Sequence, residues 1–245
     1  MKTLLNNIPC LVFSPCNEDK NTSTVFFYHG WSSCKENHIF TGEILSKFGY
    51  RVIMPDSIHH GERGSLDYND FEIGKEYFFK TIFKSIDEFK DIFEEVQQKF
   101  NIDGNSVAVM GHSMGGFIAS GIFANYKSIK TMVCFNGGTS YNMAVGELTK
   151  ADKNFRISEE DDYMIKKYDP LTKLMREDNL RPIFILHGEA DEIVPISIQN
   201  YFYNKIIPLY KKTPEILKFD KIARLNHYVT VGMLKSAIEW LDLYA

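Results

Sequence analysis

Stretches of apolar residues long enough for a β-strand alternate along this chain with stretches of helical periodicity. Seven segments have the length and composition of strands: residues 9–14, 24–28, 51–54, 106–110, 131–135, 182–186 and 215–219. Several of them are unbroken apolar runs, which is typical of strands that helices cover on both faces. The pattern predicts an α/β fold with a mostly parallel sheet of seven strands, or of eight if a short extra edge strand is present.

A long amphipathic helix is predicted between the third and fourth of these strands. Its apolar residues recur every three or four positions and therefore share one face: Ile82, Phe83, Ile86, Phe89, Phe93, Val96 and Phe100. Charged side chains, among them Lys84 and Glu88, fall on the opposite face. We expect the aromatic stripe to pack in the core, and Asp103-Gly104-Asn105 to form the turn into the next strand.

Two connections, residues 57–80 and 139–180, are longer than a simple link between a strand and a helix. The second shows two helix-start signals, a capping box and an N-cap followed by proline at the first helical position. The residues concerned are Ser158 with Asp161 and Asp169 with Pro170. Since long insertions at strand ends are usually functional loops or lids, we predict one domain over residues 1–245 with a small helical cap or lid at about 139–180.

Composition and charge narrow the classes of function. Apolar residues make up 44% and charged residues 24% of the chain, which is ordinary for a globular protein. The net charge of -4 offers no basic stripe for a phosphate backbone, so nucleic-acid binding is not expected. No run approaches the roughly 20 apolar residues that span a bilayer, and the first residues lack a signal-peptide pattern. We therefore expect a cytoplasmic protein that binds no membrane.

The strongest chemical signal is the segment Gly111-His112-Ser113-Met114-Gly115, which follows an apolar strand and precedes a helical stretch. A serine between such glycines lies on a sharp strand-to-helix turn that exposes its hydroxyl, because side chains at the glycine positions would collide. The Gly-x-Ser-x-Gly pattern alone is common, so its place between a strand and a helix carries the prediction. We predict that Ser113 is a nucleophile.

A serine that attacks a carbonyl group creates an oxyanion, which preorganised hydrogen-bond donors must stabilise. The backbone N–H of Met114 directly follows the nucleophile and is one candidate donor. The second candidate is the backbone N–H of Trp31, in the loop after strand 24–28, where Gly30 lets the backbone approach a substrate closely.

A histidine is expected to act as the base, because imidazole accepts and returns a proton readily near neutral pH. Of the seven histidines, His227 alone lies in a loop after the last predicted strand. The acid that orients it is predicted between the serine and the histidine in the chain, at the end of a strand. Asp191 fulfils this condition after strand 182–186, while Glu189 and Glu192 are rivals.

Three segments match the motifs of one family: Gly-His-Ser113-Met-Gly-Gly, His29-Gly-Trp and His-Gly-Glu-Ala-Asp191-Glu-Ile-Val-Pro. Over nearly its whole length the chain resembles the α/β-hydrolase superfamily, and its order of serine, aspartate and histidine agrees with that family. The segments that begin at His29 and Pro55 more narrowly resemble small bacterial esterases described as prolyl-oligopeptidase-like or dienelactone-hydrolase-like. Because dienelactone hydrolases normally use a cysteine nucleophile, Ser113 speaks against that activity.

The resemblance implies an α/β-hydrolase fold with a Ser113, His227 and Asp191 triad that cleaves carboxylic esters of small substrates through an acyl-serine, without a cofactor. No metal is expected, because metal-ligand spacings of histidine and cysteine are absent from the sequence. The residues predicted to line the substrate pocket are His29, Tyr141, Met143, Tyr163 and Met164. A thioesterase, a peptidase or an acyltransferase would use the same triad, and a catalytically silent binding protein on this fold is a further alternative.

Overall fold

The computed structural model describes residues 1–102, 104 and 106–245, and within them it forms one eight-stranded sheet. The strands are β1 (Lys2–Leu5), β2 (Ile8–Phe13), β3 (Thr24–Tyr28), β4 (Arg51–Pro55), β5 (Val107–His112), β6 (Thr131–Phe135), β7 (Ile183–Gly188) and β8 (Leu217–Ile222). Their spatial order is β1-β2-β4-β3-β5-β6-β7-β8. β2 is antiparallel to both of its neighbours, and the pairs from β4 to β8 are parallel, so the predicted mostly parallel sheet is confirmed. Asp103 and Asn105 of the predicted turn lie outside the described residues.

All seven predicted strands are present, and β1 is the extra edge strand. It pairs with β2 through a two-residue hairpin in which Leu5 faces Ile8. Asn6 and Asn7 form the turn with φ of 48° and 61°. Positive φ at both central positions is the mark of a type I′ turn, which asparagine tolerates and which matches the twist of the two strands. The two asparagines therefore join two strands.

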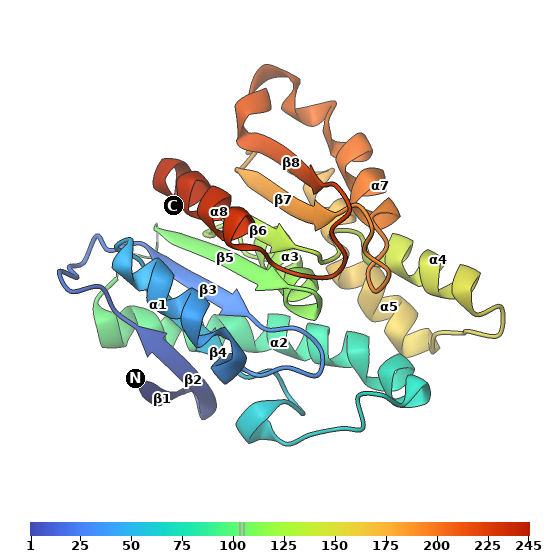
Figure 1. The fold of residues 1–245 in the computed structure, drawn as a ribbon, viewed down its shortest axis with the longest axis horizontal. Coiled ribbons are helices and arrows are strands. Elements are labelled where there is room, and N and C mark those ends of the chain that lie inside the picture. Colours follow the sequence, from blue (N-terminus) through green and yellow to red (C-terminus); the bar gives the residue numbers. More distant parts are fainter. Residues whose placement is uncertain (103, 105) are drawn as a thin grey trace.

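Helices cover both faces of the sheet (Figure 1). Their bounds are α1 (Ile39–Lys47), α2 (Phe71–Phe100), α3 (Met114–Asn125), α4 (Tyr141–Ala151), α5 (Glu159–Tyr168), α6 (Pro170–Leu174), α7 (Ser197–Ile206) and α8 (Val231–Tyr244). α1 and α8 pack on one face, where Leu45 and Leu234 join a core cluster with strand residues, while α2 and α3 pack on the other with Phe89 and Ile118. Within the described part of the chain, no helix is both long and apolar enough to cross a bilayer.

The predicted amphipathic helix is α2, and it begins at Phe71, within the connection predicted at 57–80. Asp70 caps it by accepting hydrogen bonds from the backbone N–H groups of Glu72 and Ile73, at 2.8 and 3.4 Å. The last ten residues of that connection are thus helical, which corrects the prediction of a long loop. The aromatic stripe is in the core as predicted, since Phe83 and Phe89 are buried and Phe93 and Phe100 pack against the core, partly buried.

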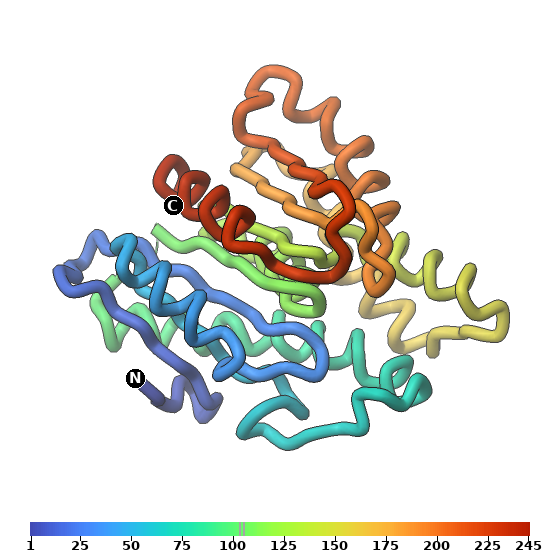
Figure 2. Tube along the Cα trace, viewed as in Figure 1, coloured from blue at the N-terminus to red at the C-terminus, as the bar shows by residue number. Residues whose placement is uncertain are grey.

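The segment 139–180 contains α4, α5 and α6 (Figure 2, yellow). α4 lies beyond the end of the sheet toward which β5 points (Figure 1), while α5 packs against α2 and α6 against α3. Both predicted helix starts are present. The Ser158 hydroxyl accepts from the backbone N–H of Asp161 at 3.0 Å, and the Asp169 carboxylate accepts from that of Thr172 at 2.9 Å. Pro170 occupies the first position of α6, where its missing N–H costs no hydrogen bond.

Candidate active site

Ser113 lies on a strained turn between β5 and α3. Its φ of 57° and ψ of -123° are unusual for a residue with a side chain, and such strain concentrates at functional sites. The backbone N–H of Ser113 donates to the carbonyl of Phe135 at 3.0 Å, which ties the turn to the end of β6. A Cβ on Gly115 would collide with the carbonyl group of Tyr28, so only glycine lets α3 start this close to β3. The sharp turn predicted from the sequence is present.

Asp191 and His227 form a hydrogen bond at the carboxyl end of β7. The Nδ1 atom of His227 lies 2.8 Å from Oδ2 of Asp191. The other carboxylate oxygen, Oδ1, accepts from the backbone N–H groups of Ile193 and Val194 at 2.9 and 2.8 Å. These bonds fix the carboxylate, and the carboxylate in turn fixes the imidazole with Nε2 as the ring nitrogen left for other partners.

The electrostatics keep Asp191 ionised. Burial by itself would raise the pKa of its carboxyl group, but hydrogen bonds from His187, His227 and the Val194 N–H outweigh burial and hold the pKa well below its usual range. His187 is fully buried, and its Nε2 lies 2.8 Å from the carbonyl oxygen of Val194 and 3.3 Å from Oδ2 of Asp191. Nε2 of His187 is thus within reach of both oxygen atoms.

The two rival carboxylates do not take the place of Asp191. Glu189 is exposed, and Glu192 accepts a hydrogen bond from the side chain of Asn226 at 3.3 Å. Asp191 is also the residue that the loop backbone holds. The contact between Asp191 and His187 has no counterpart in the sequence-based predictions, where His187 was only the end of a strand.

Ser113 and His227 lie on the same edge of the sheet. The imidazole rings of His227 and of His112, the residue before the serine, have centroids 4.9 Å apart. The side chain of Asn136, which follows β6, donates to the carbonyl of Tyr228 at 2.9 Å and holds the histidine loop there. Among the hydrogen bonds of the described residues, none joins the Ser113 hydroxyl to His227. Such bonds are often long without substrate and tighten in the reacting complex.

The loop after β3 approaches the serine closely. A Cβ on Gly30 would lie 3.2 Å from the Cβ of Ser113 and 3.7 Å from its Oγ. The backbone N–H groups of Trp31 and Met114 have no acceptor among the hydrogen bonds of the described residues, so they are available to a ligand. His29 shapes this loop, because Nδ1 lies 2.8 Å from the carbonyl oxygen of Gly30 and Nε2 accepts from the N–H of Ser57 at 3.1 Å.

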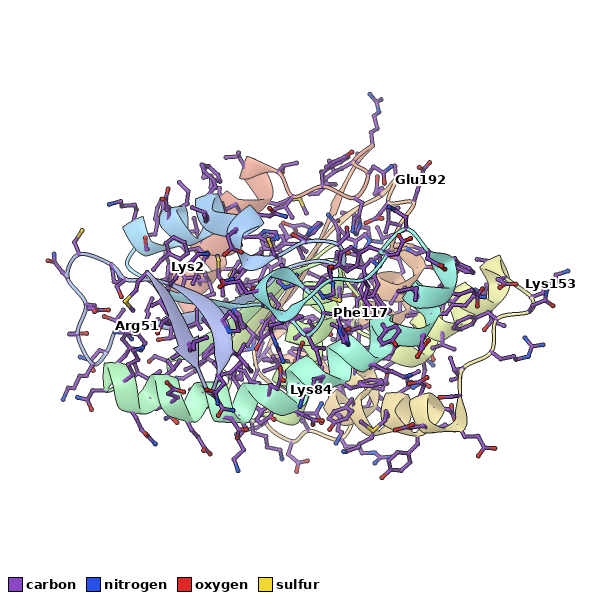
Figure 3. All side chains as sticks on the ribbon, turned by 90° about the horizontal axis from the view of Figure 1, so that it is seen from below. Lys2, Arg51, Lys84, Phe117, Lys153 and Glu192 are labelled. Atoms are coloured by element: carbon purple, nitrogen blue, oxygen red, sulfur yellow. The ribbon has the colours of Figure 1, made fainter. Side chains whose placement is uncertain are left out.

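A cavity of about 570 Å³ opens beside Ser113. Its wall comes from α2, α3, α4 and the loops that follow β3 and β7. Of its wall residues, Phe117 is buried, whereas Glu192, which lies near the outline of the molecule in Figure 3, is exposed, so the cavity reaches the surface. Its size falls within the usual range for small-molecule sites.

The five predicted pocket residues, His29 included, do not border this cavity, although the structure describes all of them. Tyr141 is fully buried and donates to the carbonyl of Phe117 at 2.7 Å. Met143 and Met164 pack against the core, and Tyr163 is 65% exposed to solvent. Tyr141, Met143 and Met164 turn into the core and Tyr163 turns outward, so other residues line the cavity beside Ser113, among them Ala144 and Leu148 of α4.

Comparison with known proteins identifies the family of this chain. The model of the family described as serine aminopeptidase S33 matches residues 19–156, more than half of the chain. The chain belongs to this family. Because the match includes Ser113 and the loop after β3 and ends before Asp191 and His227, it covers only part of the site described above.

Two relatives of this chain have names that describe them as esterases. The candidate esterase YitV of Bacillus subtilis strain 168 is 27% identical over 235 residues, which cover 93% of this chain and 91% of that one. Esterase YjfP of Escherichia coli strain K12 is 26% identical over 197 residues and 78% of each chain. TT1662 from Thermus thermophilus shares the fold with a TM-score of 0.82 at 18% identity, over 99% of this chain and 96% of that one. The predicted α/β-hydrolase fold and the resemblance to bacterial esterases are confirmed, and the chain is a hydrolase.

Two helix faces that the sequence did not assign to the pocket contribute nine of the residues that line the cavity. Their residues recur at three- and four-residue spacing: Phe71, Gly74, Lys75, Phe78 and Phe79 on α2, and Ala144, Glu147, Leu148 and Ala151 on α4. This periodicity is visible in the sequence and could have identified the two faces. It could not have shown that they face each other across a cavity.

Two buried histidines are expected to lower the stability of the folded protein at acidic pH. Burial lowers the pKa of His29 to about 3, and burial together with the nearby His227 lowers the pKa of His112 to about 3. In the unfolded chain both bind a proton near the ordinary pKa of about 6.5, so the unfolded state holds more protons between these values. Stability is therefore lost as the pH falls below about 6.5.

We expect the free energy of unfolding to fall by up to about 3 kcal/mol per pH unit between roughly pH 6 and pH 4. Denaturant titrations at a series of pH values measure this slope. A free energy of unfolding that is the same at neutral pH and at about pH 5 contradicts the burial of two neutral histidines.

Proposed function

We propose that this protein is a serine hydrolase that cleaves carboxylic esters of small substrates, with Ser113 as nucleophile, His227 as base and Asp191 as acid. The observation that carries the proposal is the 2.8 Å hydrogen bond between His227 and an ionised Asp191, on the same sheet edge as a serine in a strained turn. The esterase names of relatives that cover most of this chain support the choice of an ester as substrate.

The reaction proceeds in two steps. His227 takes the proton of the Ser113 hydroxyl through Nε2 while the oxygen attacks the ester carbonyl, and the N–H groups of Trp31 and Met114 stabilise the resulting oxyanion. The imidazolium gives its proton to the departing alcohol, which leaves an acyl-serine. Water, deprotonated by the same imidazole, attacks the acyl-serine and releases the acid with a free serine. Asp191 keeps the imidazole in the required tautomer and stabilises its charged form.

Residues 139–180 form the cap of this site in our proposal, within one domain over residues 1–245. α4 supplies part of the cavity wall, and the salt bridge of 3.1 Å between Lys75 and Asp152 joins the start of α2 to the loop after α4. A segment attached in this way to the wall of the site can shield an acyl-enzyme from bulk water.

The proposal is tested by comparing three substrate classes with purified protein: p-nitrophenyl esters, acyl-CoA thioesters and aminoacyl p-nitroanilides. We expect the esters to have the highest kcat/KM. Aminoacyl anilides that are cleaved faster than the esters would support a peptidase, as the family description names, and would contradict the esterase assignment.

A smaller change at the loop after β3 tests the oxyanion donors. In Gly30→Ala the new methyl group crowds Ser113, because a Cβ at this position lies 3.2 Å from the serine Cβ. A misplacement of this kind is expected to lower kcat by about 10- to 100-fold. Gly146→Ala is the matched control, since its Cβ meets nothing within 4 Å and Gly146 does not line the cavity. Equal activity of the two variants contradicts the assignment.

A further inference from the structure

The wall of the cavity beside Ser113 is mostly apolar and aromatic. Rings of Trp31, Phe78 and Phe117 lie close to the serine, with centroids 5.9 Å apart between Trp31 and Phe78 and 5.4 Å apart between Phe78 and Phe117. Farther along, Phe71 and Phe155 continue the same lining. Since burial of apolar surface is the main source of affinity for small molecules, this wall favours an apolar substrate group.

The cavity is also elongated along two helices. Its wall includes residues from Phe71 to Phe79 on α2 and from Ala144 to Ala151 on α4. At a rise of 1.5 Å per residue, this stretch of α2 extends over about 12 Å. Gly74 has no side chain and Ala144 and Ala151 have small ones, so the space between the two helices stays open.

Charged side chains at the wall are already engaged with protein partners. Lys75 binds Glu72 at 2.8 Å and Asp152 at 3.1 Å. Glu147 binds Lys150 at 2.9 Å, and Asp70 caps α2 through the N–H groups of Glu72 and Ile73. Glu192, on the rim, accepts from Asn226 at 3.3 Å. A charged group on a substrate would enter this cavity without a free partner and would lose its hydration.

We propose that the cavity selects esters with an uncharged apolar group of medium chain length, held between α2 and α4. This inference rests on the proposed function and specifies its substrate class. The apolar group can belong to the acid or to the alcohol part of the ester, and the experiment below distinguishes these two sources.

Two homologous series test the proposal: p-nitrophenyl esters from acetate to decanoate, which lengthen the acyl chain, and alkyl acetates from methyl to octyl, which lengthen the alcohol. In one of the series kcat/KM is expected to rise by about fourfold per methylene up to hexanoate or hexyl, as burial of a CH₂ group predicts. The series that rises identifies the part of the ester in the cavity. If neither series rises, the proposal is overturned.

A second set of substrates carries a charged group at the end of the chain. The p-nitrophenyl monoester of adipic acid and the p-nitrophenyl ester of 6-aminohexanoic acid have the length of the hexanoate ester and add one charge. If the acyl group occupies the cavity, both are expected to react at least about 100-fold more slowly than the hexanoate ester. If the alcohol occupies it, the same loss is expected for acetates of 6-hydroxyhexanoic acid and 6-aminohexanol relative to hexyl acetate. A charged ester that reacts as fast as its neutral counterpart overturns the proposal.

Gly74→Leu connects the selectivity to the cavity. A Cβ at Gly74 meets nothing within 4 Å, and leucine is a better helix former than glycine, so the variant is expected to fold and to fill part of the cavity. We expect about tenfold lower kcat/KM for the longest esters of the rising series and a change below about twofold for the shortest. Gly146→Leu, on a helix position with the same open space outside the cavity, is expected to leave the whole profile unchanged.

The outcomes separate this inference from the function on which it rests. Hydrolysis of the acetate ester that disappears in Ser113→Ala, together with a flat chain-length profile, contradicts only the substrate class. Absence of any ester hydrolysis that depends on Ser113 contradicts the function itself.

Discussion

Ser113→Ala is expected to lower kcat for ester hydrolysis by at least about 10⁴-fold, with little change in the free energy of unfolding. The substitution removes one oxygen atom and leaves Cβ, and alanine can occupy the same turn between β5 and α3. Without the hydroxyl no acyl-enzyme can form, and only the oxyanion donors and the cavity remain to accelerate direct attack by water. Steady-state kinetics with a p-nitrophenyl ester and a denaturation curve measure the two quantities.

Ser46→Ala is a matched control for this variant. Ser46 lies on α1, where its hydroxyl donates to the backbone carbonyl of Glu43 at 2.9 Å, and it does not line the cavity. Its kcat is expected to stay within about twofold of wild type, because a surface substitution of this kind has little effect. Ser113→Ala with wild-type activity would mean that another residue is the nucleophile.

Asp191→Asn is expected to lower kcat by about 10⁴-fold near neutral pH. The carboxamide keeps the shape of the side chain but loses the negative charge that stabilises the imidazolium of His227. It can also present an N–H group to Nδ1 and so favour the wrong tautomer, with the proton on the nitrogen that must accept from Ser113. The loss is expected in kcat, because Asp191 does not line the cavity that binds the substrate.

Glu189→Gln makes the same chemical change two residues earlier, at an exposed carboxylate. Its activity is expected to equal that of wild type. A loss of activity in Glu189→Gln with an active Asp191→Asn would assign the acid to Glu189, which was one of its rivals in the sequence.

Local patterns in the sequence were sufficient to predict the strands of the central sheet. Apolar runs such as those of β3 and β6 predict their strands to the residue, because a strand covered on both faces has few polar positions. β1 was harder to recognise, since Lys2 and Thr3 make it polar and short. Asparagine usually interrupts a strand. Here the positive φ of Asn6 forms the turn that brings β1 back onto β2.

The choice between Asp191 and its neighbours also has a physical basis in the loop. Oδ1 of Asp191 accepts from the N–H groups of the residues two and three positions later, as the short aspartate side chain allows. A glutamate has one more methylene and closes this local turn less well. The same loop brings His187 against the carboxylate, a contact between a strand end and a loop that spacing alone does not reveal.

The cavity wall could not be predicted from periodicity. Phe71 and Phe78, which border the cavity, lie on the same face of α2 as Phe89, which packs in the core farther along the helix. Whether such a face is covered or borders a cavity depends on the distance to the opposite helix, here α4, and therefore on the tertiary structure. For this reason the sequence did not show that Tyr141 packs in the core, while Leu148 on the same face of α4 borders the cavity.

Covalent labelling tests the central claim most directly. We predict that a fluorophosphonate adds one equivalent to the folded protein, that peptide mapping by mass spectrometry places the adduct on Ser113, and that His227→Ala slows the labelling by at least about 10³-fold. Folded, hydrolytically active protein that remains unlabelled, or that carries the adduct on a different residue, would contradict the account.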